Sequence, residues 1–80
     1  MAKATLSSEV MQEVFKAAPH LLKFPAHRLW IDYDEDADVL YISFDRPQNA
    51  SDSQMLENGV GLRYKDDRIV GITILDASAR

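Results

Sequence analysis

Cysteine is absent from the 80 residues of this chain, and proline and glycine are scarce, with three of each. Without cysteine the protein has neither disulfides nor thiolate metal sites to stabilise a small core. No apolar run approaches the roughly 18 residues that span a membrane, and the first residues carry no pattern of a secretory signal. We therefore expect a cytoplasmic protein without a membrane-spanning segment.

Basic residues are outnumbered, with 9 Lys and Arg against 13 Asp and Glu, and the formal net charge is −4. Non-specific binding to nucleic acid depends on clustered Lys and Arg that release counterions from phosphates. Arg63, Lys65 and Arg68 follow one another closely, but no known nucleic-acid reader motif accompanies them. We therefore expect no nucleic-acid partner.

The length of the chain also limits its core. A domain of this size buries only about 60 to 65 per cent of the surface that its unfolded chain exposes. Small domains of this kind commonly gain stability from disulfides, a metal, a partner or self-association. With the disulfides excluded, self-association or a protein partner is the expected supplement.

Apolar residues recur with the spacing of an α-helix over residues 6–18. They form one stripe, and the polar side chains face away from it. Ser7 or Ser8 can accept a hydrogen bond from the amides of the first turn. Pro19 has no amide to donate, so it is expected to end the helix or to restart it for one further turn. We predict a helical extension over residues 6–22. Its apolar side consists of Leu6, Val10, Val14 and Ala17, with Met11, Phe15 and Ala18 beside them.

Four runs with the alternation of β-strands follow the helix, at residues 29–33, 39–44, 60–65 and 69–75. The acidic link 34–38 predicts a hairpin between the first two, and Asn58-Gly59 favours a tight turn. Residues 45–53 are read as a loop, with a short edge strand at 55–57 after it. We predict a single α+β domain, residues 1–80, in which the helix packs on one face of a small antiparallel four-stranded β-meander, residues 29–80. In that arrangement Leu6, Val10, Val14 and Phe15 cover Leu40, Ile42, Leu62 and Ile72.

The other face of this predicted sheet is too apolar for a solvated surface. A single helix covers only one face, and an exposed apolar patch of this kind usually marks a protein interface. We predict contact between copies of the chain, with a dimer favoured because a two-fold axis is the commonest symmetry. A different protein partner, or an error in the assignment of the faces, are the alternatives. The predicted interface consists of Trp30, Val39, Tyr41, Ile69, Thr73 and Leu75.

The acidic turn is the one candidate for a chemical site. Asp34, Asp36 and Asp38 alternate like the first ligands of a calcium-binding loop. That loop requires Gly at its sixth position and Glu at its twelfth, where this chain has Val39 and Asp45. The preferred interpretation is a turn in which Asp34 bonds nearby backbone amides and Asp38 fixes the start of the next strand. A weak cation site and catalytic carboxylates remain the lesser alternatives, and no metal or cofactor is predicted.

No other constellation indicates catalysis. His20 and His27 lie seven residues apart with a proline between them, which is not the spacing of metal ligands. The serines have no nucleophile-elbow context, so no triad can be assigned. We therefore expect a protein that is not an enzyme and has no catalytic residues.

The stretch Tyr33-Asp34-Glu35-Asp36-Ala37-Asp38-Val39-Leu40-Tyr41-Ile42 resembles the Y-D-x-x-A-D-x-L-Y-I signature of a small prokaryotic family, domain of unknown function 2283. Gly59-Val60, Ile69-Val70-Gly71-Ile72 and Ile74-Leu75-Asp76-Ala77-Ser78 are similar to its second half. The resemblance covers residues 29–80, and with its helical extension the chain resembles a subgroup of the family that carries such an extension. It implies a small β-rich fold and no established activity. Members are suspected to sit in two-gene modules of the toxin–antitoxin kind.

Together these observations predict a small self-associating protein-interaction module without a catalytic site. The first alternative is an antitoxin-like partner of a small toxin in a two-gene module. The second is a weak divalent-cation-dependent enzyme that uses the acidic turn.

Overall fold

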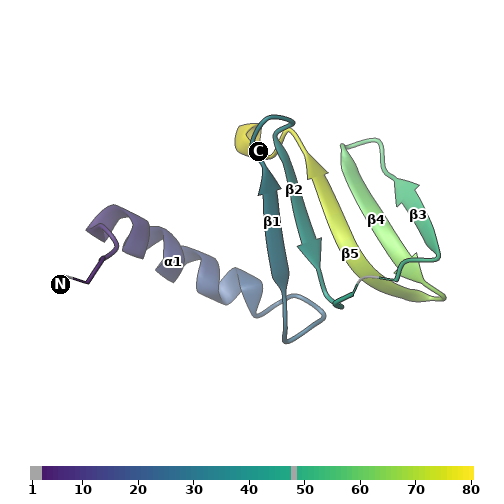
Figure 1. Cartoon of the computed structure of the whole chain (residues 1–80), viewed down its shortest axis with the longest axis horizontal. Helices are drawn as coiled ribbons and strands as arrows, with labels where there is room; N and C mark the ends of the chain where they lie inside the picture. Colours follow the sequence, from purple (N-terminus) through teal and green to yellow (C-terminus); the bar gives the residue numbers. More distant parts are fainter. Residues whose placement is uncertain (1–2, 48) are drawn as a thin grey trace.

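The computed structural model describes residues 3–47 and 49–80. Over these residues the chain forms one α-helix, an antiparallel sheet of five strands and a final 3-10 turn (Figure 1). The α+β class is confirmed, but the prediction of four strands was wrong because residues 52–55 also join the sheet. The short edge strand expected at residues 55–57 begins earlier, within the end of the predicted loop 45–53. The elements are α1 (Ser8–Leu21), β1 (Trp30–Asp34), β2 (Val39–Ser43), β3 (Asp52–Met55), β4 (Val60–Lys65), β5 (Arg68–Leu75) and η1 (Ala77–Ala79).

The strands are ordered β1-β2-β5-β4-β3 across the sheet, so the sheet is not the predicted meander. After β2 the chain crosses to the far edge, forms β3, and returns through β4 to β5, which pairs with β2. β5 is the longest strand and is almost wholly apolar. A strand of this composition is favoured in the centre of a sheet, where neighbours on both sides satisfy its backbone and shield its side chains.

The core of the sheet is small. Among the described residues, the buried apolar side chains are Val39, Ile42, Phe44 and Val70. Val70 is the most deeply buried at 1% exposure, next to the point where the register between β4 and β5 shifts. Four buried side chains are few for a folded domain, since a single sheet needs a second layer to cover its apolar face.

The tight turn predicted at Asn58-Gly59 is present between β3 and β4. Gly59 has a φ of 82°, in the left-handed region that glycine adopts without steric cost. The Asn58 side-chain oxygen accepts a hydrogen bond from the Val60 amide at 3.2 Å. The Leu56 amide donates to the Val60 carbonyl at 2.8 Å and closes the hairpin.

The predicted N-cap of the helix is confirmed at Ser7, whose hydroxyl accepts a hydrogen bond from the Val10 amide at 3.2 Å. The expectation that Pro19 ends or restarts the helix was wrong, because α1 continues through Pro19 to Leu21. Pro19 deprives only the Phe15 carbonyl of its helical donor. Water can serve that carbonyl because this part of α1 is exposed on the single chain.

The helix does not pack on the sheet, which corrects the predicted arrangement. α1 lies beyond β1 and points away from the sheet (Figure 1). It contains no buried residue, and the extensive contacts between elements are all between strands. Periodicity identified the apolar side of the helix correctly, but what covers that side depends on the path of residues 22–29. Within the described residues, no helix is long and apolar enough to cross a bilayer.

Candidate interaction surface

The register of the strands divides the sheet into two faces. Residues that pair directly across neighbouring strands share a face. Ile42 pairs with Ile31 on β1 and with Ile72 on β5, and Leu40 pairs with Tyr33 and Ile74 in the same way. No charged side chain occurs in this central set. We call it the first face: Ile31, Tyr33, Leu40, Ile42, Val60, Leu62, Ile72 and Ile74.

The first face lies bare on the single chain. Ile31 is 53% exposed and Tyr33 50%, and of the whole set only Ile42 is buried. The remaining five members, Leu40, Val60, Leu62, Ile72 and Ile74, are half-buried by their neighbours in the sheet. This is the face that the sequence assigned to the monomer core under the helix, and in the structure α1 does not cover it.

The second face carries most of the residues that the sequence assigned to an interface. Tyr41 pairs with Thr73 and Val39 with Leu75, and Trp30 lies on the same side of β1. Tyr41 is exposed, Trp30, Thr73 and Leu75 are half-buried, and Val39 is buried within the chain. The accessible area of these predicted residues therefore comes chiefly from Tyr41 and the half-buried side chains.

The second face is also more polar than the first. Asp32 pairs with Tyr41, and Arg63 pairs with Gly71 beside the centre of the sheet. Ile69, the remaining predicted interface residue, lies past the register shift and is 38% exposed. It lines a shallow cavity with Phe44, at the end of the sheet where α1 connects. The structure thus separates Ile69 from the rest of the predicted interface.

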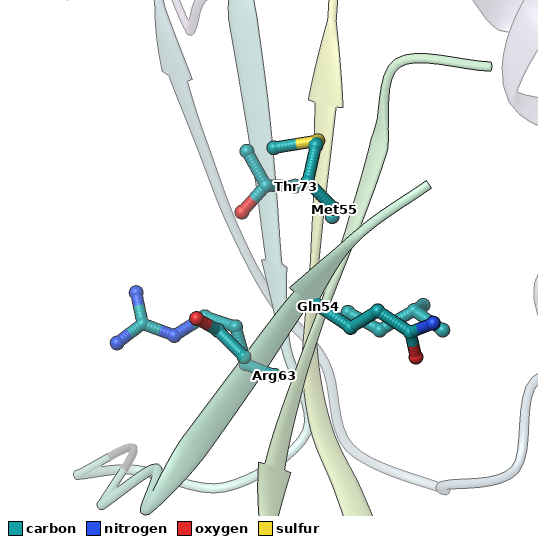
Figure 2. Close-up of a pocket in the computed structure, with 7 residues that line it drawn as sticks. Gln54, Met55, Arg63 and Thr73 are labelled. Atoms are coloured by element: carbon teal, nitrogen blue, oxygen red, sulfur yellow. The ribbon is translucent and has the colours of Figure 1, made fainter. Parts of the chain in front are cut away.

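A pocket of about 260 Å³ opens on the second face near β3. Figure 2 shows Met55 beside Thr73, while Arg63 and Gln54 point to opposite sides. A Cβ added at Gly61 would lie 3.2 Å from the Met55 methyl carbon and 3.4 Å from the Thr73 Cβ. Gly61 therefore lets Met55 lie against the sheet. Arg63 is the one charged side chain in a lining that otherwise mixes neutral polar and apolar residues.

The apolar side of α1 is the second large unpartnered surface. Phe15 is 63% exposed, Val14 47% and Val10 46%. Contiguous apolar patches of this kind usually mark an interaction site. We call this surface the α1 stripe: Leu6, Val10, Met11, Val14, Phe15, Leu21 and Leu22.

The acidic turn between β1 and β2 is built around hydrogen bonds. The Asp34 carboxylate accepts one from the Ala37 amide at 3.2 Å, three residues on, as expected of a side chain that bonds a nearby backbone amide. Asp38 accepts from the Tyr33 hydroxyl at 2.6 Å, and from the Ser78 amide and hydroxyl at 3.0 and 2.7 Å. We call Tyr33, Asp38 and Ser78 the Asp38 clasp. It ties the C-terminal turn η1 to the first hairpin.

The hydrogen bonds of the Asp38 clasp shift the pKa values of Asp38 and Tyr33. The hydrogen bond from Tyr33, followed by those from Ser78, holds the pKa of Asp38 below its usual value. The same bond to Asp38 raises the pKa of the Tyr33 hydroxyl. Asp38 is thus a fixed acceptor, and a general acid needs a raised pKa instead. Among residues 3–47 and 49–80, no three acidic or histidine side chains gather as metal ligands, so Asp34, Asp36 and Asp38 are not brought together as a site.

Sequence reasoning missed the role of Ser78. Val39 pairs with Leu75, so Asp38 and the residues that follow β5 meet at the same end of the sheet. The signal for this contact was available only once β2 and β5 were known to be neighbours. His20 and His27 lie exposed on the last turn of α1 and in the connector, and neither joins the turn.

The comparisons with known proteins agree with the resemblance noted in the sequence. A family described as "Protein of unknown function (DUF2283)" matches residues 30–78, which comprise all five strands and the Asp38 clasp. No curated protein and no solved structure gives a significant match. Since the family match covers more than half of the residues of this chain, the chain belongs to the DUF2283 family, whose function is uncharacterised.

Proposed function

We propose that the protein is a small self-associating protein-interaction module without a catalytic site. The observation that carries this proposal is the surface that a single chain leaves exposed. A folded monomer of 9.1 kDa is expected to expose about 4,900 Å². This chain exposes 6664 Å².

The excess has the size of an interface. It amounts to about 1,800 Å² per chain, or roughly 3,500 Å² for two chains, and obligate homodimers bury about 2,000 to 5,000 Å². Exposed apolar side chains contribute to this surface, at Ile31 and Tyr33 on the first face and along the α1 stripe. A second copy of the chain, in a closed two-fold pair, is the simplest structure that buries both.

The absence of catalysis is part of the same proposal. The enzymatic alternative relied on the carboxylates of Asp34, Asp36 and Asp38. Two of these, Asp34 and Asp38, accept hydrogen bonds that shape the turn. Active sites usually lie in concave pockets with converging polar groups. The acidic turn instead lies at a hairpin tip, where residues 34–37 are exposed and Asp38 is half-buried.

Native mass spectrometry of the full chain tests the proposal, with light scattering after size-exclusion chromatography as a second measurement. We expect a dimer at low micromolar concentration. A monomer that persists at about 100 μM with the sheet folded would overturn self-association. Purification from the native host adds a further comparison, because a second protein in fixed stoichiometry would replace self-association with an antitoxin-like or adaptor role.

A further inference from the structure

We infer that α1 of one copy covers the first face of a second copy, and that the exchange is reciprocal. This inference rests on the proposed self-association and specifies which surfaces meet. It begins from two surfaces that a single chain leaves without a partner, namely the α1 stripe and the first face. Each is apolar, and each belongs to an element that normally packs against another layer.

The connector keeps the two surfaces of one chain apart. The Phe24 ring packs edge-on against Phe44, with ring centroids 6.2 Å apart and an angle of 89° between the planes. The Lys23 and Phe24 amides donate to the His20 and Leu21 carbonyls, which prolongs the last turn of the helix. The chain therefore leaves α1 directly into a contact at the end of the sheet, and α1 points away from it (Figure 1).

The dimensions of the two surfaces match. α1 has 14 residues, which correspond to about 21 Å of helix at 1.5 Å per residue. Five strands at a spacing of roughly 4.8 Å make the sheet about 20 to 24 Å wide. One helix of this length therefore covers the central strands of a sheet of this width.

Charge selects the first face over the second. The second face presents Asp32 and Arg63, and an apolar helix laid over them would bury charges without partners. The first face presents apolar side chains, the Tyr33 hydroxyl on β1 and the neutral Gln54 side chain on β3, and no charged group among its paired residues. On α1, Glu13 and Lys16 face away from the stripe and bond each other at 3.5 Å, so they stay in solvent when the stripe is covered.

Reciprocal exchange of α1 buries more apolar surface than other pairings of two copies. Two sheets packed face to face would cover both first faces but leave both helices bare. Exchange of α1 covers two helices and two sheets at once and closes on a two-fold axis. It is therefore the pairing that buries the larger share of the excess surface.

Complementation between two variants of the full chain tests the exchange. Val14→Asp places a charge in the α1 stripe, and Ile31→Asp places one on an exposed position of the first face. Each variant alone should be mostly monomeric. Mixed in equal amounts they should form a dimer, because one of its two helix–sheet contacts then joins an unchanged helix to an unchanged face.

Matched controls locate the effect. Gln12→Asp makes the same new charge on the polar side of α1, and Met55→Asp does so at an exposed apolar position on the second face. Both should dimerise like the unchanged chain. Circular dichroism and amide exchange of β5 establish that each variant keeps its sheet.

The outcomes separate this inference from the proposed function. A monomeric unchanged chain would overturn both. If the unchanged chain and Val14→Asp dimerise equally, or if mixing restores no dimer, self-association stands and the exchange of α1 is wrong. Should Val14→Asp fail to fold, Val14→Ala serves instead. It removes two methyl groups at each of two contacts, so the dimer should dissociate roughly a hundredfold more readily, and an unchanged dissociation constant would contradict the exchange.

Discussion

Asp38 receives three hydrogen bonds, from one side chain in its own hairpin and from two groups of Ser78, 40 residues later. It does so from a left-handed backbone conformation, with a φ of 54°. Asp and Asn tolerate this conformation better than most residues. An aspartate at this position therefore suits the left-handed backbone and also supplies the carboxylate that accepts the hydrogen bonds of the clasp. Asp38 is therefore constrained both by its backbone and by its carboxylate.

The clasp makes stability depend on pH at both extremes. Because the folded state lowers the pKa of Asp38 below its usual 3.8, this contribution is complete above about pH 4 and is lost as the pH falls through the lowered pKa. The folded state raises the pKa of Tyr33 above 10.0, so that contribution is complete below pH 10 and is lost as the pH rises through the raised pKa. Between these limits the clasp should stabilise the fold uniformly.

Tyr33→Phe tests the clasp because it removes the donor and keeps the ring. We expect the pKa of Asp38 to rise toward its usual value, the Tm at neutral pH to fall, and the contribution of Tyr33 to the alkaline loss of stability to disappear. The carboxyl carbon of Asp38, followed by NMR titration, reports the pKa directly. Tyr41→Phe is the matched control on the facing strand, and an unchanged Asp38 titration in Tyr33→Phe would contradict the role of the bond.

At the scale of the element, α1 shows where sequence reasoning succeeds and where it stops. Its apolar stripe and its Ser7 cap follow from periodicity and from local hydrogen bonding, which act within a few residues. Its partner depends on the path of the connector, which is set by the distant contact of Phe24 with Phe44. The sheet behaves in the same way. Alternation located the main strands, but β5 lies beside β2 because of long-range pairing that no local pattern encodes.

The connector offers a test of the helix exchange that leaves both apolar surfaces unchanged. Four residues, Gly-Ser-Gly-Ser, inserted between Pro25 and Ala26 should free α1 to fold back on its own first face. A longer hinge lowers the barrier to packing within one chain and removes the need for a second copy. We expect the monomer fraction to rise, as measured by sedimentation at several concentrations.

The same four residues inserted between Asn49 and Ala50 provide the control, since they lengthen a loop that does not lead to α1. This variant should remain dimeric. If both insertions leave the dimer intact, α1 does not depend on the length of its connector and the exchanged arrangement fails.

At the scale of the whole molecule, a single chain is too extended for its length. Its radius of gyration is 14.9 Å, and a compact domain of 80 residues is expected to have one of about 11.6 Å. The projecting helix accounts for the long axis of 47 Å. Four buried apolar side chains offset only part of the conformational entropy that folding costs, so the sheet of a separated chain should be only marginally stable. Unfolding of the dimer and its dissociation should therefore be coupled.

That coupling predicts a Tm that depends on protein concentration. When two chains unfold together, each tenfold increase in concentration stabilises the dimer by about 1.4 kcal/mol. With an unfolding entropy of roughly 2.1 cal/mol/K per residue over two chains, the Tm should rise by about 4 °C for each tenfold increase. Differential scanning calorimetry from 5 to 500 μM measures this slope. The Gln12→Asp control should keep it, whereas Val14→Asp should show none, because a monomer unfolds independently of its concentration. A flat Tm in the unchanged chain would mean that the sheet folds without a second copy.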